Sequence, residues 1–206
     1  MTVWLKGWAL TIGLVGNGSS ESKFPTSGDW HSLPHPVAQS NLMILSGKTI
    51  GSLVVNKCIL GIDPGASGAI AFYFTQYPEN IAAFDVPLVD GDIDCAQLAA
   101  IIENYNPDIA IIEMVGAMPK QGVSSTFKFG MSFGMARGVV GALKIRQHYV
   151  TPAKWKKHFG LIAEKEKARE RAIQLWPKSD AFRRKKDHGR AEAALLCKYG
   201  AEVIRF

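Results

Sequence analysis

The sequence predicts an α/β fold in which helices flank a mixed five-stranded sheet. Three apolar runs, rich in β-branched and aromatic residues, follow one another with short connections, which is typical of antiparallel strands. Two further apolar runs alternate with segments of helical spacing, which indicates strands added in parallel. The chain has 206 residues, 47% of them hydrophobic and 20% charged, so it has room for one core of ordinary size.

The expected strands are short apolar runs bounded by Gly, Pro or acidic residues. In chain order they are CILGID (beginning at Cys58), GAIAFYF, NIAAFDVPL, PDIAIIEMV and QHYVTP. The first helix is expected in DCAQLAAIIENYN, where apolar residues recur at helical spacing. Later helices are expected at about Ser124–Lys144, Ala153–Phe159, Glu164–Leu175 and Gly189–Gly200.

Residues 1–56 differ in composition from the folded domain expected over residues 57–206. They are rich in Ser and Gly, contain three prolines and show little periodicity, so we expect a poorly ordered extension. Their one apolar run is too short to span a membrane, and the segment has no arginine of the kind that transit peptides carry. Translation from Met43 is a further alternative. The three cysteines show no CxxC spacing, so we expect a reducing, cytoplasmic compartment, with organellar import left open.

Positive charge is concentrated in the last third of the sequence. The segment Lys144–Arg190 holds fifteen Lys or Arg and five Asp or Glu, a balance of +10, whereas the rest of the chain carries −4 of the net +6. Aromatic residues such as Trp155 and Trp176 are interleaved with the basic ones. A basic surface of this kind favours a polyanionic partner, although a solvated helical face is an equal alternative.

Four acidic residues stand at positions where a carboxylate is unexpected. Asp63 and Glu113 each interrupt an apolar strand, and the two strands are expected to lie side by side. Glu192 precedes the apolar AALL of the last helix, and Asp187 suits the N-cap of that helix. A turn or a cap explains Asp63 or Asp187 equally well, but explains Glu113 and Glu192 less well.

Converging carboxylates with no Cys or His cluster favour a hard divalent cation, Mg²⁺ or Mn²⁺. Two such ions can activate a water and stabilise the leaving oxygen of a phosphodiester. An acidic metal site beside a basic surface is typical of a nuclease. No feature of the sequence indicates a small-molecule cofactor.

Five motifs occur in one order along the chain: GIDPGASGAIA, AIIEMVGAMP, FGMSFGMARGVVGAL, VTPAKWKKHFGL and KKDHGRAEAALL. Together they resemble the RuvC-like Holliday junction resolvases of the RNase H-like superfamily, in the branch found in phages, bacteria and plastids. The resemblance covers the chain from Cys58 onward. It implies a homodimer that binds a four-way junction and nicks two strands symmetrically with Mg²⁺, leaving a 5′-phosphate and a 3′-hydroxyl.

The resemblance also implies roles for individual residues. Asp63, Glu113 and Glu192 match the family's acids, each a metal ligand and catalytic residue. Bacterial RuvC proteins carry a further aspartate three residues before the last acid, where this chain has Gly189. Either Asp187 or His188 substitutes for it, or the site has only three acids. We expect Asp187 to be the fourth ligand, with His188 as a ligand or proton shuttle.

DNA contacts are expected from a loop that enters the junction and from nearby helices. An apolar side chain of this region could wedge between bases at the crossover, although core packing is an equal alternative for Phe127. Four glycines between Gly130 and Gly141 share one helical face, which predicts close approach to the sheet or to a second subunit. The residues expected at DNA are Met118, Lys120, Phe127, Lys128, Lys167 and Arg190.

Two other classes of function are compatible with parts of the sequence. An actin-like ATPase also begins with a strand and a Gly/Ser turn, but it needs a second phosphate loop and a second domain that about 150 residues cannot supply. A catalytically silent RNase H-like module that binds branched DNA as a scaffold is the stronger alternative. The sequence therefore predicts a structure-selective DNA endonuclease.

Overall fold

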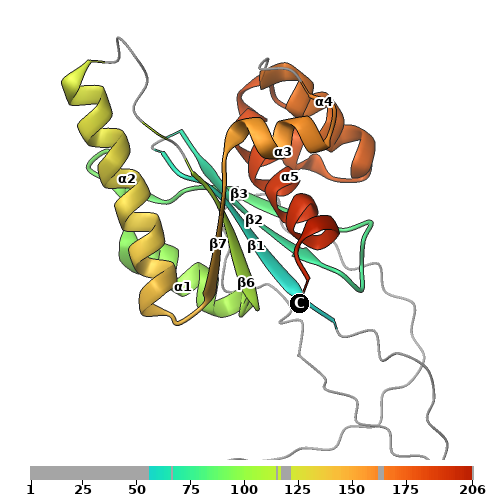
Figure 1. Ribbon diagram of the computed structural model, residues 1–206, viewed down its shortest axis with the longest axis horizontal. Helices are drawn as coiled ribbons and strands as arrows, with labels where there is room; N and C mark the ends of the chain where they lie inside the picture. Colours follow the sequence, from blue (N-terminus) through green and yellow to red (C-terminus); the bar gives the residue numbers. More distant parts are fainter. Residues whose placement is uncertain (1–55, 66, 115, 117–121, 162–164, 206) are drawn as a thin grey trace, which may run out of the picture.

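The structure is a computed structural model, shown in Figure 1, and describes residues 56–65, 67–114, 116, 122–161 and 165–205. The expected N-terminal extension, apart from its last residue, lies outside the described residues, as do Met118 and Lys120. In the described ranges, no helix is both long enough and apolar enough to cross a membrane.

Five strands form the central sheet in the order β3-β2-β1-β6-β7. Strands β1 (Cys58–Asp63), β2 (Ala69–Phe74) and β3 (Ala82–Asp85) are antiparallel neighbours. Strand β6 (Ile109–Glu113) pairs in parallel with β1, and β7 (Arg146–Val150) pairs in parallel with β6. The predicted mixed sheet of three antiparallel strands followed by parallel additions is confirmed.

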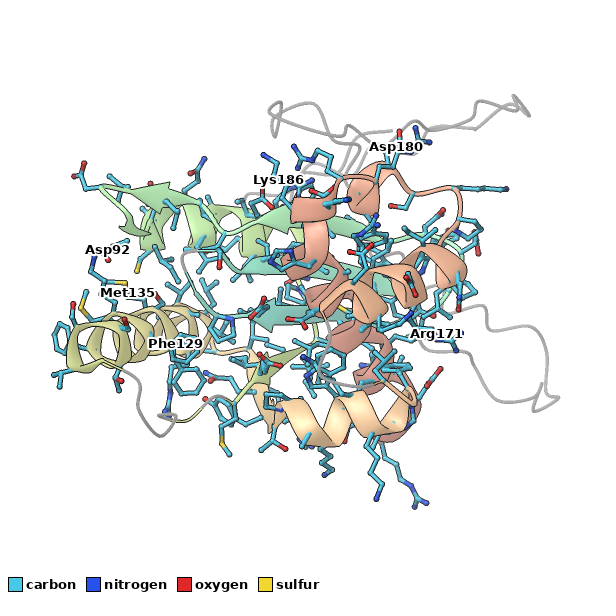
Figure 2. All side chains as sticks on the ribbon, turned by 90° about the horizontal axis from the view of Figure 1, so that it is seen from above. Asp92, Phe129, Met135, Arg171, Asp180 and Lys186 are labelled. Atoms are coloured by element: carbon cyan, nitrogen blue, oxygen red, sulfur yellow. The ribbon has the colours of Figure 1, made fainter. Side chains whose placement is uncertain are left out.

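Helices cover both faces of the sheet. Helices α1 (Cys95–Tyr105) and α2 (Val123–Ala142) lie on one face, while α3 (Pro152–His158), α4 (Lys165–Leu175) and α5 (His188–Val203) lie on the other (Figure 1). Figure 2, seen from above, shows the same division, with Phe129 and Met135 on the α2 side and Arg171 and Lys186 on the opposite side. Because the sheet is covered on both faces, its central strands β1 and β6 are apolar up to the acid that ends each of them.

Alternate residues of each central strand belong to two separate cores. Ile59 and Ile111 pack with α5, whereas Leu60 and Ile112 pack with α1 and α2. Helix α5 is so deeply buried that ten of its sixteen residues lie in the interior. This explains why the last helix carries small residues on several faces.

The third expected strand is shorter than its apolar sequence suggests. Strand β3 ends at Asp85, and a separate pair of two-residue strands follows, β4 (Leu88–Val89) and β5 (Asp92–Ile93). Asp90 and Gly91 join them with φ of 52° and 85°, which is the left-handed turn that Asp-Gly favours. Strands of two residues carry no period, so the pattern could not reveal them.

The glycine face of α2 does not touch the sheet. A Cβ added to Gly130, Gly134 or Gly138 would meet nothing within 4 Å among the described residues, and Gly141 is near only the side chain of Gln147. The helix instead buries a different row, Ser132, Ala136 and Val140. Of the two predicted reasons for this glycine face, close approach to the sheet is therefore wrong for the first three.

Candidate functional site

Two acids end adjacent parallel strands. Ile62 of β1 pairs with Ile112 of β6, and Asp63 and Glu113 follow one residue later on each strand. Both therefore lie on the face that Ile59 and Ile111 share with α5. Glu113 is 6% exposed, so its carboxylate is held in the protein interior.

Glycines bring the start of α5 against Asp63. A Cβ on Gly61 would lie 2.1 Å from the Ala193 carbonyl oxygen, so the helix crosses β1 in direct backbone contact. A Cβ on Gly189 would lie 2.9 Å from the Ser67 carbonyl oxygen and 3.5 Å from Oδ2 of Asp63. A side chain at position 189 would therefore need the β1–β2 turn to move.

Glu192 follows one turn after Gly189 and is also 6% exposed. The ammonium of Lys156 lies 2.9 Å from its Oε1, with the Lys156 side chain 18% exposed. This approach is close enough for an ion pair but does not have hydrogen-bond geometry, so no residue of the described ranges donates a hydrogen bond to Oε1. A buried carboxylate oxygen in this state is suited to a further donor or a cation.

Helix α3 serves both buried acids through two consecutive residues. Trp155, fully buried, donates from Nε1 to Oε1 of Glu113 at 2.8 Å, and Lys156 pairs with Glu192. Thr151 and Pro152 begin this helix directly after β7, which ends beside Glu113. Sequence reasoning missed both roles, although both residues lie in the quoted motif VTPAKWKKHFGL. The partners of Trp155 and Lys156 are set by the tertiary structure. In the sequence, only the motif itself indicated that these two residues matter.

Asp187 is placed as predicted, directly before α5, but its carboxylate is engaged elsewhere. Arg184 donates to Oδ2 from its backbone nitrogen at 2.7 Å, and to Oδ1 from Nε at 2.9 Å and Nη2 at 2.7 Å. Burial raises the pKa of Asp187, but the hydrogen bonds and charge of Arg184 outweigh it and hold this pKa below its ordinary value. In this arrangement, Asp187 closes the short 3₁₀ turn Lys185–Asp187.

His188 is the first residue of α5 and lies one turn before Glu192. Its Nδ1 is 3.3 Å from the carbonyl oxygen of Lys185, and as a donor there it would leave Nε2 with a lone pair. Four-residue spacing on a helix puts His188 and Glu192 on neighbouring positions of one face. His188 is thus better placed than Asp187 to act with Glu192.

The donors fit a divalent metal ion in their chemistry. They are the carboxylate oxygens of Asp63, Glu113 and Glu192, which lie on two strands and on a buried helix. Glu113 and Glu192 are buried. As placed, however, no three Asp, Glu, His or Cys side chains in the described part of the chain are close enough to share one ion. Metal binding would therefore need rotation of these side chains.

The residues expected to contact DNA are placed in different surroundings. Phe127, at the start of α2, is 68% exposed, which excludes core packing within the described residues. Lys128 is also exposed. By contrast, Arg190 makes two 2.7 Å hydrogen bonds to Asp85, and Lys167 pairs with Glu170 at 3.1 Å.

Comparison with known proteins gives matches among solved structures only. No family model and no curated protein matches the chain. The RuvC of Thermus thermophilus in complex with a Holliday junction substrate matches with TM-score 0.50 and 14% identity, over 71% of this chain and 95% of that chain. A second T. thermophilus RuvC structure matches with TM-score 0.50 and 12% identity, over 70% and 95%.

The yeast mitochondrial Holliday junction resolvase also matches, with 18% identity over 68% of this chain and 75% of that chain, at TM-score 0.40. At these identities, the matches to the two T. thermophilus RuvC structures establish the fold. The chain therefore has the RNase H-like fold of the RuvC structures, as the resemblance of its motifs predicted.

Proposed function

We propose that this chain is a structure-selective DNA endonuclease that resolves four-way junctions by metal-dependent hydrolysis. The observation that carries the proposal is the acid set at one end of the sheet. Asp63 and Glu113 end adjacent strands, and the buried Glu192 comes from the helix packed across them. The fold is that of RuvC, and one RuvC structure contains a Holliday junction, which supports the choice of substrate.

Asp63, Glu113 and Glu192 would hold Mg²⁺ or Mn²⁺, which when bound supplies an activated water and neutralises the leaving oxygen. Trp155 fixes one oxygen of Glu113 by its hydrogen bond. Lys156 compensates the charge of the buried Glu192. The protein thus orients two of the three acids in advance through one helix.

The fourth ligand is either Asp187, as expected from the sequence, or His188. We favour His188, because three hydrogen bonds from Arg184 already hold the Asp187 carboxylate. To bind a metal ion, Asp187 would have to give up charge-assisted hydrogen bonds, each worth about 1.5–3 kcal/mol. His188→Ala should then impair metal-dependent cleavage more than Asp187→Asn does.

Paired nicks need two active sites, so we propose that the protein acts as a homodimer. Exposed apolar side chains at the start of α2, Val123 at 87% and Phe127 at 68%, support a partner near the acid end of the sheet. Phe127 can serve as a wedge at the crossover, because an inserted aromatic ring unstacks a base step.

The proposal is tested by cleavage of a labelled four-way junction beside a linear duplex of the same sequence, with Mg²⁺. Wild type is compared with Asp63→Asn, and binding of both variants is followed in Ca²⁺. Symmetric nicks by wild type, lost in Asp63→Asn while binding survives, are expected. If wild type does not prefer the junction, the proposal is wrong.

A catalytically silent scaffold that binds branched DNA is the second candidate. Two observations favour it: position 189 has no side chain, and no three metal-binding residues gather in the described part of the chain. Tight junction binding in Ca²⁺ without nicking in either Mg²⁺ or Mn²⁺ would assign the protein to this class.

A further inference from the structure

Six basic side chains of the segment Lys144–Arg190 are neutralised by acidic side chains within the protein. Arg190 is bound by Asp85, and Arg184 by Asp187. Further ion pairs are Lys156–Glu192, Lys167–Glu170, Arg169–Glu166 and Arg183–Asp180. The charge count of this segment therefore overstates the positive charge that it offers to a polyanion.

Among the cations outside these ion pairs, four lie close together: Arg137, Lys144, Arg146 and Lys154, which we call the β7-edge patch. Within the described ranges, none of the four has an acidic group within ion-pair distance. They come from the end of α2, the turn after it, the edge strand β7 and the start of α3. This patch is therefore an uncompensated positive surface.

The patch borders an open groove. Arg137, Lys144 and Arg146 line it together with the glycines Gly134, Gly138 and Gly141. Lys154 adds to the same positive electrostatic potential, as the pKa of His148 shows. Burial, followed by the charges of Lys154 and Arg146, holds the pKa of the intervening His148 below its usual value.

Arg137 is held in place for binding. Its guanidinium carbon lies 5.6 Å from the ring centroid of Phe133 and 5.3 Å from that of Tyr149. Gln147 donates to the Arg137 carbonyl oxygen at 3.1 Å and accepts a hydrogen bond from the Tyr149 hydroxyl. A guanidinium held beside two aromatic rings loses less freedom when it binds an anion than a fully mobile one does.

We propose that the β7-edge patch binds the phosphate backbone of a duplex arm, at a distance from the acids. This inference rests on the proposed function, and it identifies the surface along which one duplex arm of the junction would lie. Arg146 pairs with Ile109, whereas Val150 pairs with Glu113, so four residues, about 13 Å of strand, separate the patch from the acid end. At 3.4 Å per nucleotide step, this spans roughly four base pairs of an arm.

The positive charge of the patch favours DNA over a second copy of the chain as its partner. In a two-fold symmetric contact the same surface lies on both sides, so two positive patches would face each other. A phosphate backbone instead carries one negative charge per about 1.7 Å of duplex, and each contact releases counterions. The groove with its basic sides therefore favours DNA.

The test measures junction affinity in Ca²⁺ against salt concentration for Arg137→Gln/Arg146→Gln. The control, Lys178→Gln/Arg183→Gln, removes the same charge from exposed positions between α4 and α5. The patch variant should bind on the order of tenfold or more weakly near 0.1 M salt, with a salt slope smaller by about 2. The control should keep the wild-type slope. An unchanged slope in the patch variant would overturn the proposal.

Two further measurements keep this inference separate from the nuclease proposal. Light scattering gives the mass of each variant, and a patch variant that changes its oligomeric state would identify a subunit contact instead, against the proposal. The same titrations are made on linear duplex. If wild type shows no preference for the junction, the nuclease proposal fails. The patch proposal then stands only if the duplex salt slope falls in the patch variant.

Discussion

The two sides of the sheet use glycine and charge in opposite ways. On the α5 side, Gly61 lies where helix and strand touch, and the buried Glu192 is paired. On the α2 side, a Cβ added to Gly134 or Gly138 would meet nothing within 4 Å among the described residues, and the cations near them have no acidic partner there. Helix α5 thus packs closely on the sheet, whereas the outer surface of α2 and β7 carries cations without an acidic partner in the part of the chain that the structure describes.

The largest expected effect separates the two kinds of glycine. Gly61→Ala puts a methyl group 2.1 Å from a backbone oxygen that cannot move alone, so we expect a loss of at least about 3 kcal/mol in the free energy of unfolding. Gly130→Ala, where nothing lies within 4 Å, should stabilise α2 by about 0.5–1 kcal/mol. Urea unfolding of both variants measures this. Equal effects would show that α5 does not cross β1 as described.

The next effect tests the paired charges. Lys156→Met leaves Glu192 buried without its cation, so stability should fall by about 3 kcal/mol. The adjacent exposed Lys157→Met should change stability by less than about 0.5 kcal/mol. Adding Glu192→Leu to Lys156→Met should restore most of the loss, as judged by thermal or urea unfolding. A double variant no more stable than Lys156→Met would contradict the pairing.

A smaller effect concerns the hydrogen bond to Glu113. Trp155→Phe removes the donor and should cost about 2 kcal/mol of stability. It should also weaken Mn²⁺ binding, followed as metal-induced thermal stabilisation, by roughly tenfold. Trp176→Phe is the matched control, since that buried indole donates to the Pro78 carbonyl oxygen at 3.1 Å, away from the acids. If both variants lose Mn²⁺ binding equally, Trp155 has no positioning role.

The smallest effect is a pH dependence. Because the folded-state pKa of Asp187 is lowered, its contribution to stability is present above the unfolded-state value near 3.8 and is lost as the pH falls through the folded-state value. Asp187→Asn keeps acceptor capacity but loses the charge, so it should cost about 1.5 kcal/mol at pH 7 and far less at low pH. Urea unfolding of wild type and variant at both pH values checks this. A difference that persists unchanged in acid would mean that Arg184 does not bind the ionised carboxylate.

The sequence predicts the sheet well because its strands are buried on both faces and are therefore continuous apolar runs. An acid inside such a run, as at Glu113, is visible for the same reason. The partners of these acids are not visible. Trp155 lies 42 residues from Glu113, and only the tertiary structure brings the two side chains together.

Charge counting fails for a related reason. The sequence shows the excess of Lys and Arg between positions 144 and 190, but not which of them face an acid. Arg190 and Asp85 are 105 residues apart and form a bidentate ion pair. Likewise, the cap position of Asp187 can be predicted from the sequence. The hydrogen bonds that the Arg184 side chain donates to Asp187 cannot.

The direct contact of α5 with β1 also bears on the order of folding. Every strand of the sheet precedes α5 in the chain, and Cys197 of α5 donates to the Ile59 carbonyl oxygen across 138 residues. Contacts of such long sequence separation form late and slow folding. During synthesis, the sheet must therefore wait with one apolar face uncovered until α5 leaves the ribosome. The helix that closes the core also delivers Glu192, so a nascent chain has no complete acid set before its fold is finished.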